Sequence, residues 1–302
     1  MKEAVLGLDG GASSSRWLLL DSQGQEVFTG RLGAITGHLF DEAAREDVLG
    51  PLETLVTGVR TVLEQHHLKL TSIVAGITGL SEGDESAQFL ENYLRNSLNP
   101  EKIGLYHDMV IAYRNAFKPG EGILIYAGTG AIAFYMDEEK SLRAGGYGYL
   151  IDDEGAGFGI GRAALQWLMR AHDETGERVG GVLAGLLYGG VGSSHWPQIR
   201  EAVYGGGRSK VASLAPLVNQ AAQQGDKAAQ HILHKAGQEL TRLVKALQKR
   251  LHPQTLPIAF AGGISLFPEV VQTLAESLGR EEIKCIIREP VWAAAEMALD
   301  FI

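Results

Sequence analysis

The opening of the chain constrains its fold most, because two apolar segments there are joined by a short turn rich in glycine and serine. Residues 5–20 read VLGLDGGASSSRWLLL. Two apolar runs separated in this way predict a β-hairpin. The glycines let backbone N–H groups approach a ligand, and the hydroxyl groups offer further donors. On these residues alone, a phosphate-binding hairpin and an ordinary hairpin with a polar tip are equally acceptable interpretations.

The same arrangement recurs after a boundary signal in the middle of the chain. Residues 118–122 read KPGEG, which is typical of a break between domains. Strands are predicted over 123–127 and 131–136, with a Gly-Thr-Gly turn at 128–130 between them. This recurrence is a weak internal repeat, and it predicts two related halves that each contribute one hairpin to a common ligand.

Strands and helices are predicted to alternate along most of the sequence. Such alternation, preceded by hairpins, indicates an α/β protein with mixed sheets and helices on their faces. Further strands are predicted over 25–31, 71–79, 102–106, 256–261 and 283–287, and helices over 41–67 (with Asp41 as N-cap), 84–98, 109–117, 163–172, 179–187, 209–224, 226–251, 267–278 and 290–299.

Residues 145–161 form the most unusual segment, which reads GGYGYLIDDEGAGFGIG. It holds too many glycines for a regular helix or strand. Three consecutive acids, Asp152, Asp153 and Glu154, would suit a solvated loop. Because aromatic and aliphatic residues are interleaved with these acids, a loop folded against a cleft is favoured instead.

Composition narrows the class of partner. The formal net charge is −9 and no basic stripe is visible, so nucleic acid and anionic membranes are poor partners. No apolar run is long enough to span a membrane, and no signal-peptide pattern precedes the first strand, so a cytoplasmic location is expected. Cys285 is the single cysteine, and no cysteine–histidine cluster predicts a zinc site.

Four motifs, DGGASSSR, AGTGAIAF, GGYGYLIDDEGAGFGIG and AFAGGI, occur in this order. Together they resemble the N-acetylglucosamine kinase family, which is grouped with the BadF/BadG/BcrA/BcrD ATPase domain in the actin/hexokinase/Hsp70-like superfamily. The resemblance covers nearly the whole chain. It implies two actin-like (ribonuclease H-like) ATPase domains, each a mixed five-stranded sheet flanked by helices, around a central cleft. The first would comprise residues 1–118 plus a C-terminal helix at about 289–302, and the second residues 119–288, with extra helices.

The resemblance also implies roles for single residues. Asp108, which follows the strand KIGLYH, matches the catalytic aspartate and would contact the sugar. From the residues alone, Asp108 is also a natural helix N-cap. His38 is kept as a sugar-side candidate, although a structural or surface role is favoured for a lone histidine. The remaining implied positions are Asp9 near Mg²⁺; Gly10, Gly11, Ser13 and Ser14 in the first phosphate loop; Gly128, Thr129 and Gly130 in the second; Gly262 and Gly263 beside the adenosine; and Gly145, Gly146, Tyr147 and Asp153, preferred over Glu154, beside the sugar.

The implied activity is ATP-dependent phosphorylation of the 6-hydroxyl of an amino sugar, with N-acetylglucosamine first and glucosamine second. ATP and Mg²⁺ are the implied cofactors, and a homodimer is expected. Two loops depart from the family pattern, because animal members carry a sugar-binding asparagine in each. In this chain the first of these loops has Gly37, and the second has Ala131 and Ile132 after the Gly-Thr-Gly turn. The departures leave the identity of the amino sugar open.

Two alternatives belong to other functional classes. An ATPase that activates a reductase or dehydratase would share an iron–sulfur cluster between subunits and would need two cysteines from each, whereas this chain has one. A non-catalytic sugar sensor would need an output domain, and no helix-turn-helix pattern precedes the first strand.

Overall fold

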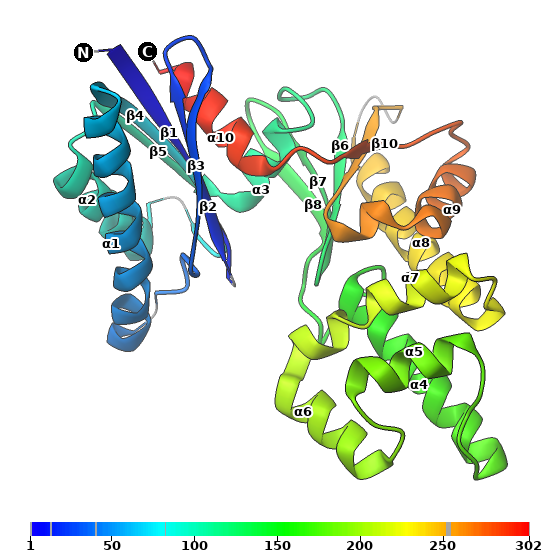
Figure 1. The fold of residues 1–302 in the computed structure, drawn as a ribbon. Helices are drawn as coiled ribbons and strands as arrows, with labels where there is room; N and C mark the ends of the chain where they lie inside the picture. Colours follow the sequence, from blue (N-terminus) through cyan, green and yellow to red (C-terminus); the bar gives the residue numbers. More distant parts are fainter. Residues whose placement is uncertain (1, 13, 40, 82, 252–254, 302) are drawn as a thin grey trace. The chain divides into compact units, whose positions relative to one another are not determined.

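The computed structural model describes residues 2–12, 14–39, 41–81, 83–251 and 255–301. The chain forms two compact units, residues 1–117 with 288–302 and residues 118–287. Each unit contains one five-stranded mixed sheet flanked by helices (Figure 1). The predicted α/β class with two such sheets is therefore confirmed. No helix within the described residues combines the length and the apolar character needed to cross a membrane.

The first unit is built on a sheet with strand order β3-β2-β1-β4-β5. Strands β1, β2 and β3 pair antiparallel, whereas β4 pairs parallel with both β1 and β5. The elements are β1 (Lys2–Gly10), β2 (Ser15–Asp21), β3 (Glu26–Leu32), α1 (Glu42–Gln65), β4 (Leu68–Ile77), α2 (Glu85–Leu98), β5 (Lys102–His107), α3 (Asp108–Arg114) and, from the end of the chain, α10 (Pro290–Leu299).

The second unit repeats this topology. Its strand order is β10-β9-β6-β7-β8, again with three antiparallel strands followed by two parallel ones. The internal repeat seen in the sequence is therefore a repeat of the fold. The elements are β6 (Ile123–Ala127), β7 (Ala131–Met136), β8 (Ser141–Gly145), α4 (Gly157–Thr175), α5 (Val182–Val191), α6 (Trp196–Ala212), α7 (Ala215–Gln223), α8 (Lys227–Gln248), β9 (Ile258–Ala261), the 3₁₀ helix η1 (Gly263–Leu266), α9 (Pro268–Leu278) and β10 (Lys284–Ile286).

Alternation along β1 explains how the first sheet is covered on both faces. Leu6 and Leu8 pack into the core formed with α1 and α2. Val5 lies on the opposite face, in a core that includes Val291 of α10. Because successive side chains of a strand point to opposite faces, one apolar strand supplies both layers. Figure 1 shows α10, in red, lying against β1 although the two are at opposite ends of the sequence.

Gly7 of β1 is where α10 approaches the sheet most closely. A Cβ atom at Gly7 would lie 2.4 Å from the backbone nitrogen of Ala295 and 2.7 Å from the carbonyl oxygen of Val291. Gly7→Ala is therefore expected to lower the free energy of unfolding by about 3 kcal/mol, because backbone must move to admit the methyl group. Denaturant unfolding followed by circular dichroism measures the change.

Gly185 provides the matched control for that substitution. It lies exposed inside α5, where a Cβ atom would meet nothing within 4 Å. Gly185→Ala is expected to raise the free energy of unfolding by about 0.5–1 kcal/mol, since alanine favours the helix. Equal stabilities for the two variants would contradict the packing described for Gly7.

Two parts of the second unit differ from the sequence prediction. Helix α4 begins at Gly157 rather than 163, inside the segment predicted to be irregular. Its glycines are required by close packing: a Cβ atom at Gly161 would lie 2.0 Å from the Val211 carbonyl oxygen. Helix α6 begins at Trp196, so helix also covers much of 196–208, where none was predicted. Gly207 interrupts it with φ 56° and ψ −149°, a conformation that side chains disfavour.

Candidate functional site

At the tip of the first hairpin, Gly10 and Gly11 have no room for side chains. A Cβ atom at Gly10 would lie 2.8 Å from the Ile35 carbonyl oxygen, and one at Gly11 would lie 2.6 Å from the Ser14 carbonyl oxygen. The buried hydroxyl of Ser15 accepts a hydrogen bond from the Ile35 N–H at 2.9 Å. Ser14 is exposed, and Ser13 lies outside the described residues. At Gly10 and Gly11 the chain therefore presents peptide groups, next to the exposed side chains of Ala12 and Ser14.

Asp9 lies at the end of β1, opposite Arg16 in the register of β1 and β2. Burial and the nearby Asp108 carboxylate raise the pKa of Asp9 to about 6, although Arg16 opposes the rise. Arg16 is itself paired with Glu289, which precedes α10. Asp9 is therefore ionised at neutral pH and loses its charge on mild acidification.

A single carboxylate of this kind suits Mg²⁺, which proteins usually hold through one or two carboxylates together with substrate phosphates. Within the described ranges, no group of three or more histidine, cysteine or acidic residues forms a cage that could hold a metal by itself. Asp9 is therefore better suited to a metal ion that binds together with a nucleotide than to one that protein side chains hold by themselves.

Asp108 is the first residue of α3 and follows β5 directly. The cap of this helix is His107, whose Nδ1 accepts the Met109 N–H at 3.2 Å. Asp108 is therefore free of the capping role that the sequence also allowed. Its Oδ2 accepts a hydrogen bond from Thr78 Oγ1 at 2.7 Å. Its Oδ1 lies 2.7 Å from His107 Nδ1 but has no well-directed hydrogen bond among the described residues.

These contacts fix the charge state of Asp108. Burial acts to raise its pKa, but His107 and Thr78 outweigh burial and hold the pKa below its usual value. The side chain as a whole is 29% exposed, whereas its Oδ1 atom, which lacks a hydrogen-bond partner among the described residues, is buried. An ionised carboxylate with one oxygen anchored and the other lacking a hydrogen bond is equipped to take a proton from a hydroxyl group.

The loop before α1 also reaches this neighbourhood. The Thr78 carbonyl oxygen accepts the Gly37 N–H at 2.9 Å and the Thr36 hydroxyl at 3.1 Å. His38 packs against Gly79, where a Cβ atom would lie 2.3 Å from the His38 Cε1 atom. The structure thus brings His38 close to the residue that anchors Asp108. Gly37 has no space for a side chain, because its Cβ would lie 2.6 Å from the Leu80 nitrogen.

The N-terminus of α4 hydrogen-bonds to the tip of the second hairpin. The Gly157 N–H donates to the Gly128 carbonyl oxygen at 2.8 Å, and the Phe158 N–H donates to the Thr129 carbonyl oxygen at 3.2 Å. The carbonyl groups are thereby used, whereas the N–H groups of Thr129 and Gly130 have no partner in the described part of the chain. The positive end of the α4 dipole lies at the same place. The tip is suited to an anion.

Gly262 joins the second hairpin from β9. It has φ 89°, and a Cβ atom there would lie 2.3 Å from the Ala127 carbonyl oxygen. Gly263, which starts η1, has open space where a Cβ atom would stand. The structure therefore places the Gly262–Gly263 pair beside the 128–130 turn, within the second unit.

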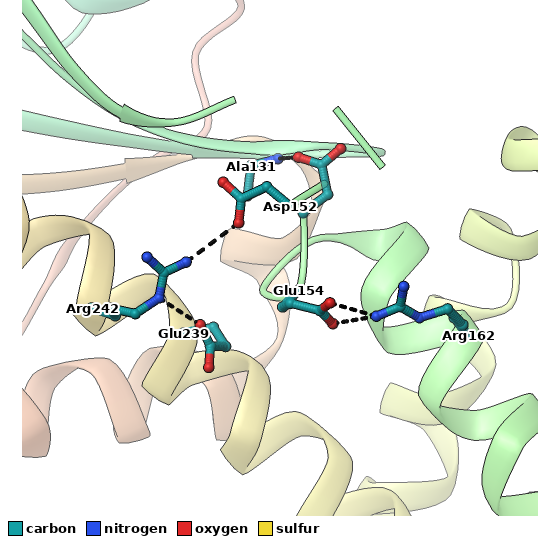
Figure 2. Close-up of polar contacts among 7 residues, drawn as sticks. Ala131, Asp152, Glu154, Arg162, Glu239 and Arg242 are labelled. Atoms are coloured by element: carbon teal, nitrogen blue, oxygen red, sulfur yellow. Dashed lines mark hydrogen bonds and ion pairs between the residues drawn. The ribbon is translucent and has the colours of Figure 1, made fainter. Parts of the chain in front are cut away.

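The three consecutive acids are not a solvated patch, because each is paired with an arginine from a different helix. Arg242 of α8 lies 3.3 Å from Asp152, and Arg162 of α4 lies 2.6 Å from Glu154 (Figure 2). Asp153 pairs with Arg208 of α6 at 3.1 Å. The acidic segment is therefore a junction between three helices.

Asp153 contacts the second hairpin directly. It is 2% exposed, and its Oδ1 accepts the Ala131 N–H at 2.8 Å. Burial raises its pKa, and the bonds from Ala131 and Arg208 offset only part of the rise. Tyr147 is by contrast 57% exposed, with the Arg143 guanidinium 5.1 Å from its ring centre. Gly145 and Gly146, which lead to Tyr147, both have positive φ.

Sequence reasoning missed Thr78 and Arg208. Thr78 follows β4, the parallel neighbour of β5, so polar residues at the carboxyl ends of these two strands were a usable signal for the Thr78–Asp108 pair. Arg208 carried no such signal, since it follows three glycines and lies just before the predicted start of a helix at residue 209.

Comparison with known proteins identifies the family of this chain. Residues 6–299 match the BadF/BadG/BcrA/BcrD ATPase family. The chain belongs to that family. It is 30% identical to the N-acetylmuramic acid/N-acetylglucosamine kinase of Clostridium acetobutylicum, over 86% of this chain and 85% of that protein. It is 25% identical to the N-acetyl-D-glucosamine kinase of Dictyostelium discoideum, over 87% of this chain and 85% of that protein.

Solved structures with low sequence identity show the same fold. A candidate N-acetylglucosamine kinase from Porphyromonas gingivalis superimposes with a TM-score of 0.75 at 19% identity, covering 98% of this chain and 99% of that one. A candidate N-acetylglucosamine kinase from Chromobacterium violaceum gives 0.72 at 23% identity, with 98% of both chains covered.

Proposed function

We propose that this BadF-family protein is an ATP-dependent kinase that phosphorylates the 6-hydroxyl of an amino sugar, with N-acetylglucosamine the first candidate. The observation that carries the proposal is the state of Asp108. Its carboxylate is ionised, anchored through one oxygen by Thr78, and lacks a directed hydrogen bond on the other. Both named relatives with broad coverage are kinases of N-acetylated amino sugars, which supports the same class of substrate.

The proposed mechanism divides the work among the residues described above. Asp108 accepts the proton of the sugar hydroxyl as that oxygen attacks the terminal phosphoryl group. The peptide N–H groups of Thr129 and Gly130, at the tip of the second hairpin, hold phosphate oxygens. Gly10 and Gly11 of the first hairpin are kept as candidates for a phosphate loop, although the Gly11 N–H lies 3.4 Å from the Ser15 hydroxyl oxygen in the structure. Asp9 would hold Mg²⁺, which neutralises phosphate charge when it is bound.

The 2-substituent of the sugar must be recognised by groups other than the two loop asparagines that the animal enzymes use. Gly37 has no space for an amide side chain, and Ala131 is buried with its N–H bonded to Asp153. We therefore propose His38 and Tyr147, which are exposed, together with Gly145 and Gly146, which have positive φ and lead to Tyr147, as the sugar-side candidates.

A substrate panel tests the proposal. ATP turnover is expected with N-acetylglucosamine, and its kcat/KM is expected to exceed that for glucose by at least about tenfold, as for a site that hydrogen-bonds the acetamido group. The panel should include glucosamine and N-acetylmuramic acid, and phosphorus–proton correlation NMR of the product should locate the phosphate at O6. Absence of turnover with every hexose and amino sugar would refute the proposal.

The reductase-activating alternative has no support from the cysteine. Cys285 of β10 is half-buried, and burial raises the pKa of its thiol. A thiol of this kind is a poor cluster ligand, because iron–sulfur clusters are held by thiolates. Iron analysis of the purified protein, run beside the substrate panel, separates the two activities.

A further inference from the structure

Arg208 occupies a special position in α6. It directly follows Gly207, whose φ of 56° breaks the helix and re-aims the chain. The guanidinium lies 5.5 Å from the centre of the Tyr149 ring, and its Nη2 is 3.1 Å from Asp153 Oδ2. The Arg208 side chain is 39% exposed, whereas that of Asp153 is 2% exposed. An accessible cation is therefore paired with a buried carboxylate.

This pair packs directly against the tip of the second hairpin. A Cβ atom at Gly130 would lie 2.7 Å from Arg208 Nη2 and 2.9 Å from both carboxylate oxygens of Asp153. The other oxygen of Asp153 accepts the N–H of Ala131, the next residue. The end of the turn is thus fixed by the carboxylate, and the carboxylate is fixed by Arg208.

No neighbouring arginine duplicates this contact among the described ion pairs. Arg242 pairs with Asp152 and Glu239, and Arg162 pairs with Glu154. Without Arg208, the Asp153 carboxylate would keep one backbone hydrogen bond and no opposite charge. A buried carboxylate in that state is costly, so it would take up a proton or turn towards water and release the Ala131 N–H.

We propose that Arg208 is a positioning residue for nucleotide binding, which acts through Asp153 to hold the 128–131 turn in the conformation that presents its N–H groups to phosphate. The inference rests on the proposed role of this turn in binding ATP. It assigns to α6 a function that involves no contact with the reacting atoms.

Isothermal titration with the non-hydrolysable analogue AMP-PNP and Mg²⁺ tests the assignment. Arg208→Met is expected to raise the Kd for AMP-PNP by about tenfold, and Arg208→Lys, which keeps the charge, by only about threefold. Arg242→Met is the matched control, because it removes a similar ion pair from Asp152 without touching the turn, and it is expected to leave the Kd within about twofold. An unchanged Kd in Arg208→Met, or an equal loss in Arg242→Met, would overturn the inference.

Steady-state kinetics separate positioning from general damage. The KM for ATP is expected to rise in Arg208→Met about as much as the Kd, while kcat changes by less than about threefold, because the turn binds nucleotide in the ground and transition states alike. In an Asp153→Asn background, Arg208→Met is expected to add little, since the two residues act as one unit. Additive losses would show that Arg208 does not act through Asp153.

Hydrogen exchange of the free protein keeps the inference distinct from the proposed function. Peptides covering residues 127–131 are expected to exchange faster in Arg208→Met than in wild type, with Arg242→Met unchanged. If wild-type protein fails to bind AMP-PNP, the proposed function of the turn falls, while this measurement still tests whether Arg208 orders it. Unchanged exchange in Arg208→Met overturns the positioning role, including for a variant that folds but loses activity for other reasons.

Discussion

Asp108→Asn is expected to reduce kcat by about 10³-fold while the Kd for the sugar changes by less than about threefold. The asparagine keeps the size of the side chain and still accepts the Thr78 hydroxyl, which is 2.7 Å from Oδ2 in the native protein. It removes the negative charge that takes the proton of the attacking hydroxyl. Coupled ADP release measures kcat, and titration calorimetry measures sugar binding.

Asp84 offers a control of the same chemistry in the same unit. It caps α2 by accepting the Ala87 N–H at 2.8 Å, and asparagine caps helices equally well. Asp84→Asn should therefore leave kcat within about twofold of wild type, because N-capping is preserved. Near-normal turnover in Asp108→Asn would exclude Asp108 as the proton acceptor.

Asp9→Asn is expected to reduce kcat/KM for ATP by at least about 10²-fold and, unusually, to stabilise the protein at neutral pH. Activity falls because the proposed Mg²⁺ ligand is gone. Stability rises because burial and Asp108 raise the pKa of Asp9 to about 6, which means that folding disfavours its charged form. Loss of activity together with loss of stability would indicate that Asp9 has a structural role instead.

The sign of the pH dependence follows from that pKa. An unfolded aspartate titrates near 3.9, so wild type and Asp9→Asn should be equally stable below about pH 4. As the pH rises from about 4 to about 6, the wild-type fold loses about 1–3 kcal/mol of stability that the variant keeps, and the difference is constant above about pH 6. Denaturant unfolding of both proteins at pH 4, 6 and 8 checks the divergence, without interference from the titration of ATP.

The pKa of Asp9 also predicts that kcat/KM falls as the pH is lowered through about 6. Asp108 stays ionised to lower pH, because His107 and Thr78 hold its pKa below the usual value. The fall near pH 6 is therefore expected to report Asp9 rather than Asp108.

Local chemistry in the sequence was sufficient for the architecture. Helices were predicted to start at residues 41, 84 and 226, with Asp41 as an N-cap. In the structure Asp41, Asp84 and Asp226 each cap a helix by accepting a hydrogen bond from its first turn. Apolar strands and glycine turns also marked both hairpins, because each of these signals spans only a few neighbouring residues. Repetition of these short signals predicted two related halves, and the family resemblance implied the two five-stranded sheets that the structure contains.

The partners of the acidic residues were decided only by tertiary packing. Thr78 is 30 residues from Asp108, and Arg208 is 55 residues from Asp153. Nothing local records such a pair, because it depends on which strand neighbours β5 and on how α6 packs against α4. The first turn of α4 was missed for the same reason. Glycine has a low helix propensity, so Gly157 and Gly161 argued against a helix in the sequence. Only the backbone that packs against them in the structure shows why larger residues would not fit there. The sequence alone therefore determined the elements and the kind of chemistry, whereas three-dimensional packing determined which groups hold Asp108 and the second hairpin in place.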